Sequence, residues 1–243
     1  MRENALSMLS RFRGELIVSC QANDGEPLAR LPHIVALAES ARIGGAGGLR
    51  VDGADAVAAC SAATGLPVIG IKKVAGGGPR PMITPRLSDF QSLARAGADV
   101  IAFDASYQYQ PDDKALAELV GTAAAMLKTP LMADISTLEE AERAIRCGAD
   151  FVATTLWGYT PDTVKEEGPA MQLARTISDH HIPVLVEGRI DTPSDVADAF
   201  DAGAIAVIVG SAITNPVYLT KRFLTGVPRS RNAVPAQGAL DVE

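Results

Sequence analysis

Side chains that can move protons follow two apolar runs of this chain. The run at residues 66–71 ends in the lysine pair Lys72 and Lys73, and the run at residues 183–186 ends in Glu187. A neutral lysine and a protonated glutamic acid that face each other across a ligand can remove a proton from carbon and return one. Neighbouring side chains of a strand point to opposite faces, so we expect only one lysine to face the ligand. This alternation alone does not say which.

The ends of the other apolar runs are also rich in polar groups. They carry Ser19, Cys20, Gln21, Arg50, Asp52, Asp104, Ser106, Asp134, Ser136, Thr154, Thr155, Arg189, Ser211 and Thr214. If the runs are parallel strands, these side chains meet at one carboxyl-terminal mouth, where ligands of α/β proteins bind. Gly188 and Gly210 end the last two runs and would let a phosphate approach backbone N–H groups. The sequence therefore predicts an anion site that includes Gly188, Arg189, Gly210 and Ser211.

The elements that position these groups recur along the chain. Four segments that lead from a glycine into an apolar run place Gly44, Gly97, Gly148 and Gly203 at spacings of 53, 51 and 55 residues. A second series of apolar runs lies between them, and amphipathic helical patterns separate the runs. The eight expected strands are residues 15–21, 47–52, 67–73, 99–105, 130–135, 150–156, 183–188 and 205–210.

Eight strand–helix units with right-handed crossovers close most simply into a (β/α)₈ TIM barrel. An open doubly wound sheet is the alternative, and the two-unit period favours the barrel because barrel layers draw on alternate strands. No internal linker is visible, so we expect one catalytic domain over residues 1–227. Residues 228–243 have little periodicity, and we expect a C-terminal extension that is mobile or packs on a neighbouring subunit.

Composition excludes several classes of partner. The formal net charge is −7 with no basic block, which argues against nucleic acid and anionic membranes as partners. Three scattered cysteines indicate a reducing compartment, and no signal peptide or membrane span is visible, so we expect a soluble cytoplasmic protein. No His, Asp or Glu cluster has metal-ligand spacing. Only Asp104 and Asp134 could share a Mg²⁺ with a substrate phosphate.

Several strings together resemble one enzyme family, the N-acylglucosamine-6-phosphate 2-epimerases. They are "GELIVSCQA", "PVIGIKK" followed by "ITP", "MADISTLEEA", "TTLWGYT", "VEGRIDTP" and "VGSAIT", which run in the family's order from about residue 13 to residue 225. The resemblance implies a (β/α)₈ barrel that interconverts N-acetylmannosamine 6-phosphate and N-acetylglucosamine 6-phosphate. It also implies that the reaction uses neither a metal nor an organic cofactor.

The resemblance assigns roles to individual residues. The catalytic lysine falls on Lys73, and the place of Lys72 is usually apolar. The catalytic carboxylic acid falls on Glu187. The polar groups that orient the sugar match Gln21, Arg50 and Asp134, and the phosphate site matches the glycines that end the last two strands.

The chain departs from the family's pattern at three places near the expected mouth. Asn215 stands where the family normally has arginine, residues 107–110 replace an arginine-containing stretch, and Trp157 replaces a small residue. We therefore expect a substrate that is altered around its phosphate or its acyl group. The candidates to supply a missing positive charge are Arg80, Arg86 and Lys72.

Two other functions remain open from the residues. A sugar-phosphate lyase would use Lys73 to form a Schiff base, and a non-catalytic relative would bind the sugar phosphate without turnover. The family resemblance and the C-terminal extension also suggest a homodimer.

Overall fold

The computed structural model describes residues 2–23, 25–76 and 78–228, and within them eight parallel strands close into a barrel. The barrel strands are β1 (Leu16–Cys20), β2 (Gly48–Asp52), β3 (Val68–Ile71), β6 (Val100–Asp104), β7 (Leu131–Asp134), β8 (Phe151–Ala153), β9 (Val184–Glu187) and β10 (Val207–Val209). They follow one another around the barrel in chain order, and β10 pairs with β1 in parallel, Leu16 opposite Val207. The predicted (β/α)₈ barrel is confirmed, and the open sheet is excluded.

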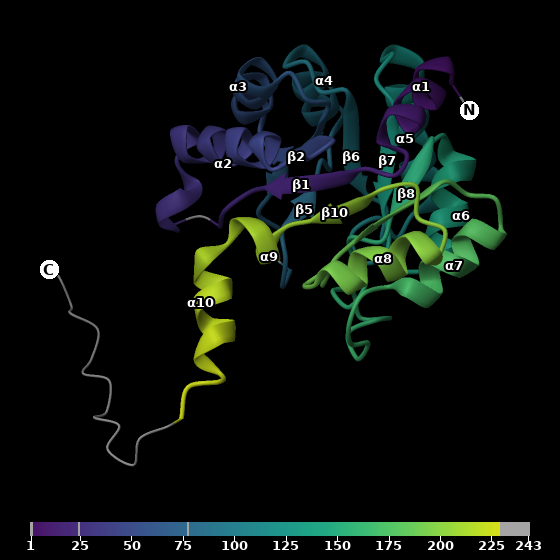
Figure 1. Cartoon of the computed structure of the whole chain (residues 1–243). Coiled ribbons are helices and arrows are strands. Elements are labelled where there is room, and N and C mark those ends of the chain that lie inside the picture. The colour runs from purple at the N-terminus through teal and green to yellow at the C-terminus, as the bar shows by residue number, and fades with distance from the viewer. Residues whose placement is uncertain (1, 24, 77, 229–243) are drawn as a thin grey trace, which may run out of the picture.

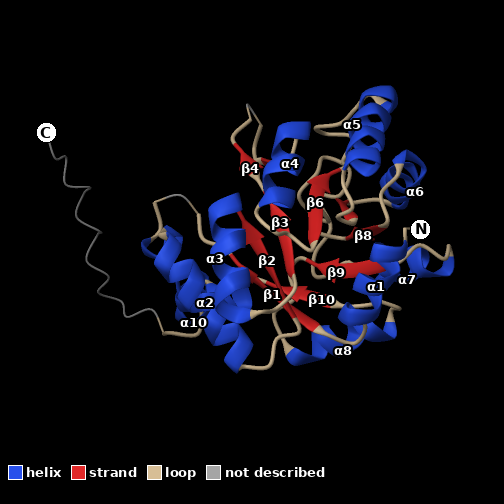
Figure 2. Cartoon of the chain, turned by 90° about the horizontal axis from the view of Figure 1, so that it is seen from above, coloured by secondary structure: helices blue, strands red, loops and turns tan. Residues whose placement is uncertain are grey.

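Helices surround the strands on the outside (Figures 1 and 2). They are α1 (Glu3–Phe12), α2 (Leu31–Ile43), α3 (Ala54–Thr64), α4 (Leu87–Arg95), α5 (Asp113–Met126), α6 (Leu138–Cys147), α7 (Met171–Asp179), α8 (Pro193–Asp201), α9 (Ser211–Thr214) and α10 (Pro216–Leu224), with a 3₁₀ turn at Pro27–Ala29. Capping boxes begin two of these helices, formed by Thr137 with Glu140 at α6 and by Thr192 with Asp195 at α8.

Alternate residues of each strand fill the inside of the barrel. Ile17, Ile69, Val100, Met132, Phe151, Leu185 and Ile208 form one buried apolar cluster inside it. Their strand neighbours, such as Val18, Val68 and Val152, belong to a second cluster that packs beneath the helices. This division fixes, for every strand, which positions point inwards.

The sequence did not predict helix α1, which closes one end of the barrel interior. Its Met8, Leu9 and Phe12 belong to the same cluster as the interior strand residues, and Phe12 is completely buried. An ion pair between Arg2 and the buried Asp150 anchors the start of the helix. The helix therefore covers the mouth at the N-terminal ends of the strands, and the ligand must enter from the other mouth.

The strand expected at residues 67–73 ends earlier, at Ile71. Lys73 and Val74 form β4, which pairs in the antiparallel direction with β5 (Met82–Ile83). Thr84 makes this change of direction: its hydroxyl donates to the carbonyl of Ala102 on β6 at 2.6 Å, and its backbone N–H donates to the carbonyl of Lys72 at 2.7 Å. Lys73 therefore lies on a small hairpin above the barrel.

The predicted extension at residues 228–243 lies, apart from Pro228, outside the described residues. Helix α10, which precedes it, extends away from the barrel (Figure 1) and has no buried residue. None of the described helices combines the length and apolar character that crossing a bilayer requires.

Candidate active site

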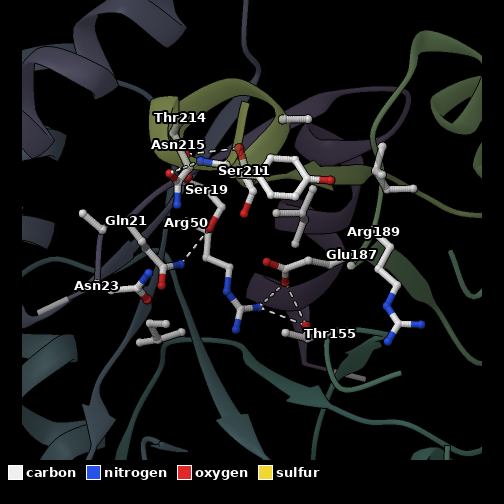
Figure 3. A pocket seen from close by; sticks show the side chains of 18 of the residues that line it. Ser19, Gln21, Asn23, Arg50, Thr155, Glu187, Arg189, Ser211, Thr214 and Asn215 are labelled. Atoms are coloured by element: carbon white, nitrogen blue, oxygen red, sulfur yellow. Dashed lines mark hydrogen bonds and ion pairs between the residues drawn. The ribbon is translucent and has the colours of Figure 1, made fainter. Parts of the chain in front are cut away.

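A cavity of about 530 Å³ opens at the mouth formed by the C-terminal ends of the strands (Figure 3). Eight of the nine residues expected to bind substrate or act in catalysis come from five strands and their loops and line it: Gln21, Arg50, Lys73, Glu187, Gly188, Arg189, Gly210 and Ser211. Asp134 is the one that does not line it. It is completely buried and lies behind Arg50.

Strand alternation explains why these side chains converge. On β3, Ile69 and Ile71 point into the barrel, so the next inward position is Lys73. On β9, Leu185 points inwards, and Glu187 follows at the next inward position. The same count from the interior residues of β1, β2, β7 and β8 leads to Ser19 and Gln21, Arg50, Asp134 and Thr155. Each side chain thus continues the inner face of its strand beyond the apolar layers.

A buried ion-pair network forms the floor of the cavity. The Arg50 guanidinium donates to both oxygens of Asp134, from Nη1 at 2.9 Å and from Nη2 at 2.6 Å, and Arg50 Nη1 lies 2.7 Å from Glu187 Oε2. Burial by itself would lower the pKa of Arg50, but the carboxylates of Asp134 and Glu187 raise it overall. The guanidinium is therefore a fixed positive charge, held in a planar fork by Asp134.

The hydroxyl of Thr155 links the two carboxyl groups of this network. It lies 2.7 Å from Asp134 Oδ1 and 2.8 Å from Glu187 Oε2. Burial raises the pKa of Glu187 above its ordinary value. Attraction to Arg50 opposes this rise, and repulsion from Asp134 adds to it. A carboxyl group with a raised pKa can hold a proton nearer to neutral pH, as a general acid must.

Glu187 has one oxygen in the network and presents the other side of its carboxyl group to the cavity (Figure 3). Its side chain is 12% exposed. The charge on Lys73 acts in the direction that lowers the pKa of Glu187, so the two groups are within electrostatic reach of each other. Because they come from β9 and from the segment after β3, they approach the cavity from different sides.

The structure separates the two lysines. Lys73 is half-buried and lines the cavity, and its backbone N–H donates to Asp52 Oδ1 at 2.9 Å. Lys72 is exposed and does not line this cavity. The contacts of Asp52 and Thr84 with the backbone of this segment fix which lysine points inwards.

The far end of the cavity, near β9 and β10, is built from backbone and small polar groups. Gly188 has a φ of +104°, a conformation that favours glycine, and Gly210 begins the short helix α9 with Ser211. Asn215 lines the cavity here, and its side-chain oxygen accepts the backbone N–H of Tyr218 at 2.9 Å, which caps α10. Arg189 contributes lining atoms, but its guanidinium donates to the carbonyl of Gly158 at 3.1 Å.

Of the three departures from the family's pattern, only Asn215 lines this cavity. Trp157, which we expected at the ligand mouth, packs against the core beneath the helices, and its buried Nε1–H has no acceptor among the described residues. Residues 107–110 hold Arg80 in place: Gln108 Oε1 accepts a hydrogen bond from Arg80 Nε at 3.2 Å. The exposed Arg86 does not line the cavity either.

The two candidate magnesium ligands are each bound by an arginine. Asp104 Oδ2 lies 2.5 Å from Arg80 Nη1, and Asp134 is bound by Arg50. Within the described residues, no group of three His, Cys, Asp or Glu side chains is placed to hold a metal ion. Burial and the neighbouring Cys60 raise the pKa of Cys20 to about 12, so Cys20 is a protonated thiol, and it packs beneath the helices and does not line the cavity.

Sequence reasoning did not assign a role to several lining residues. They are Ser19, Asn23, Thr155, Tyr159, Asp191 and Tyr218. Thr155 was recognisable as a polar strand end, but nothing in the sequence showed that it joins Asp134 to Glu187. Tyr218 donates its hydroxyl to Asp191 at 2.7 Å, which brings α10 to the loop after β9, and only the fold reveals this contact.

Comparisons with known proteins show which family the chain resembles. Residues 34–229 match the sequence model of the family described as "Putative N-acetylmannosamine-6-phosphate epimerase". Two proteins named "Putative N-acetylmannosamine-6-phosphate 2-epimerase" are similar over most of both chains. The one from Caldanaerobacter subterraneus is 38% identical over 93% of this chain and 96% of its own, and the one from Clostridioides difficile is 40% identical over 90% and 99%.

A solved structure shares the architecture. The N-acetylmannosamine-6-phosphate 2-epimerase from Clostridium perfringens superposes with a TM-score of 0.80 at 35% identity, covering 90% of this chain and 95% of that one. The family model spans most of the chain, and the relatives align along nearly their whole length. The chain therefore belongs to the N-acetylmannosamine-6-phosphate 2-epimerase family, a family of isomerases.

Proposed function

We propose that this protein interconverts N-acetylmannosamine 6-phosphate and N-acetylglucosamine 6-phosphate by inverting C2 through proton transfer between Lys73, Glu187 and the substrate. Membership of the family supports the substrate and the reaction. The observation that carries the mechanism is Glu187: its pKa is raised by burial, and its carboxyl group faces a cavity that Lys73 also lines.

Inversion at carbon requires proton removal from one face of C2 and proton delivery to the other. The C2 proton becomes acidic only when C1 is an open-chain aldehyde, because the electrons of the broken C–H bond then move onto the C1 oxygen and leave an enol-like intermediate. In one direction the neutral amine of Lys73 accepts the proton and the carboxylic acid of Glu187 donates one. In the reverse direction the protonated Lys73 donates a proton and the carboxylate of Glu187 accepts one.

The floor of the cavity supports the charge that develops on the C1 oxygen. The Arg50 guanidinium is fixed by Asp134 and needs no reorganisation when the charge appears, and the Gln21 amide lines the same cavity. Asp134, which the family resemblance placed among the sugar-orienting groups, acts in this proposal by holding Arg50. The intermediate is thus stabilised by groups that are in position before it forms.

The phosphate group lies at the end of the cavity near β9 and β10 in this proposal. The turn at Gly188 and the start of α9 at Gly210 and Ser211 let an anion approach the backbone closely. Asn215 offers a side-chain amide at this end where relatives in the family normally carry arginine. We therefore expect weaker phosphate binding than an arginine would give.

We further propose that the protein is a homodimer. Helix α10 has no buried residue, and Phe223, Leu224 and Val227 at its end are 79%, 58% and 56% exposed. Apolar side chains in such a row are typical of a surface that a second subunit covers. The three cysteines, which all lie in the described part of the chain, are free thiols, as the proposed reducing cytoplasm would leave them.

Deuterium exchange tests the proposal. In heavy water, the enzyme should convert N-acetylmannosamine 6-phosphate into N-acetylglucosamine 6-phosphate that carries deuterium at C2, and Lys73→Ala and Glu187→Ala should abolish formation of this product. Lys72→Ala should still exchange, which makes it the matched control for its neighbour. Absence of exchange in the wild-type protein, despite measurable ligand binding, would favour the non-catalytic relative. Trapping of a substrate on Lys73 with borohydride would favour the Schiff-base lyase.

A further inference from the structure

A second cavity adjoins the catalytic cavity on the side of Lys73. It has a volume of about 490 Å³ and lies between the loops that follow β1 and β3, above the end of β2. We call it the annex; Asn23, Asp52, Lys72, Lys73, Gly76 and Arg80 are among the residues that line it. Lys73 and Asn23 also line the catalytic cavity, so the two spaces meet at the proposed catalytic lysine.

The walls of the annex carry charges of both signs. Arg80 contributes one wall, but its guanidinium lies 2.5 Å from the buried carboxylate of Asp104 and is neutralised there. Asp52 faces the annex with a carboxylate that already accepts the backbone N–H of Lys73. Lys72 is exposed and has no ion-pair partner among the described residues, so its charge is available to a ligand. Lys72 is therefore the cationic group of the annex that remains for an anionic ligand.

The position of Lys73 limits which parts of the substrate can lie beside the annex. For proton transfer, C2 must come within roughly 3.5 Å of the amine nitrogen of Lys73. The acylated nitrogen of the sugar is bonded to this same carbon, so a chain attached to that nitrogen begins close to the place where the two cavities meet. An acetyl group ends in a methyl group and offers Lys72 no charged partner.

We propose that the annex binds the N-acyl group of the substrate, and that the enzyme accepts N-acylmannosamine 6-phosphates whose acyl chain is longer than acetyl and ends in a carboxylate held by Lys72. This inference rests on the proposed function, because it assumes that the reacting carbon lies beside Lys73. It gives Lys72, which the proton transfer does not require, a role in the choice of substrate.

A series of four substrates tests the inference. The probes are the 6-phosphates of N-acetyl-, N-succinyl-, N-succinamoyl- and N-(4-methylpentanoyl)mannosamine, and the measurement is kcat/KM for deuterium incorporation at C2. The last three acyl groups have equal numbers of non-hydrogen atoms and differ in charge and polarity. We expect the succinyl compound to be turned over at least as efficiently as the acetyl compound, and better than the two uncharged compounds of equal size.

Substitution of Lys72 separates charge from size. Lys72→Met should lower the ratio of kcat/KM for the succinyl compound to that for the acetyl compound by about fivefold, the effect of one partly exposed ion pair. Lys72→Arg should restore the ratio, and Lys114→Met, on the outer helix α5, is the control for loss of an exposed lysine. A ratio unchanged in Lys72→Met would overturn the role of Lys72.

The failures of the two proposals are distinguishable. Exchange with the acetyl compound, but none with any of the three longer compounds, would overturn the annex proposal and leave the proposed function standing. Equal turnover of all three longer compounds would show that the annex takes the acyl chain without selecting its charge, and would overturn the carboxylate preference. No exchange with any of the four would overturn the proposed function together with this inference.

Discussion

Replacement of Asp134 by asparagine should lower both the stability of the protein and the pKa of Glu187. Asp134 is 0% exposed and binds a guanidinium that is 1% exposed through two hydrogen bonds. Removing one partner of such a pair costs about 3 to 5 kcal/mol, because a charge is left buried without compensation. In Asp134→Asn, Glu187 remains 2.7 Å from the guanidinium of Arg50, and the asparagine oxygen still accepts one hydrogen bond. We therefore expect a loss near the lower limit, about 3 kcal/mol.

This loss is measurable by unfolding in urea. For a chain of this length it corresponds to a decrease in Tm of about 6 to 12 °C. The matched control is Asp104→Asn, which breaks the other buried aspartate–arginine contact, to Arg80, outside the catalytic cavity. Both variants should lose stability.

The pH dependence of kcat/KM distinguishes them. Asp134 raises the pKa of Glu187 by repulsion, and Arg50 lowers it by attraction. The asparagine removes the repulsion and leaves Arg50 to pair with Glu187 alone, so the pKa of Glu187 falls in Asp134→Asn. In the pH profile of kcat/KM, the limb at which activity is lost as Glu187 gives up its proton should therefore move to lower pH in Asp134→Asn. The same limb should remain in place in Asp104→Asn. An Asp134→Asn enzyme with an unmoved limb would refute the reasoning, because Asp134 would then act only on stability.

Three further changes test separate features. Glu187→Gln keeps the shape of the side chain and removes the acidic proton, so epimerisation at C2 should slow by about 10² to 10⁴ while the Tm stays within a few degrees of wild type; a variant that epimerises at the normal rate would exclude Glu187 as the acid. Gly188→Ala forces a β-carbon onto a φ of +104° and should cost about 1 to 2 kcal/mol in urea unfolding and raise KM for the phosphorylated substrate. Its stability should stay at the wild-type value only if the turn can change shape. Because the pKa of Cys20 is raised to about 12, iodoacetamide at pH 8 should label it only on unfolding, as followed by mass spectrometry. Rapid labelling of the folded protein would contradict its burial.

The fold class and most of the site are encoded in local sequence pattern. Regular spacing of glycine-led apolar runs predicts eight strand–helix units, and eight such units close into the observed barrel. Polar residues at the ends of apolar runs predict the lining of one mouth, because parallel strands bring all their carboxyl ends together. Gln21, Arg50, Lys73 and Glu187 are therefore recognisable from the sequence as site residues, although their roles came from the family resemblance.

The sequence does not show which face of each strand points into the barrel. Features that depend on this choice could be identified only in the folded chain. The alternation of a strand sends Lys72 and Lys73 to opposite faces, and in the folded chain the packing of Ile69 and Ile71 and the backbone contacts of Asp52 and Thr84 direct Lys73 to the cavity. Asp134 was expected to touch the sugar, and its position behind Arg50 follows from contacts between strands that are far apart in the sequence.

The annex was also invisible in the sequence, because it exists only where loops from β1 and β3 come together. The same is true of the role of Arg80. In the sequence it was a candidate to supply a missing positive charge, and the fold places it against Asp104 on another strand. Local pattern fixes which residues end each strand, whereas charge pairing between strands depends on distances that only the closed barrel sets.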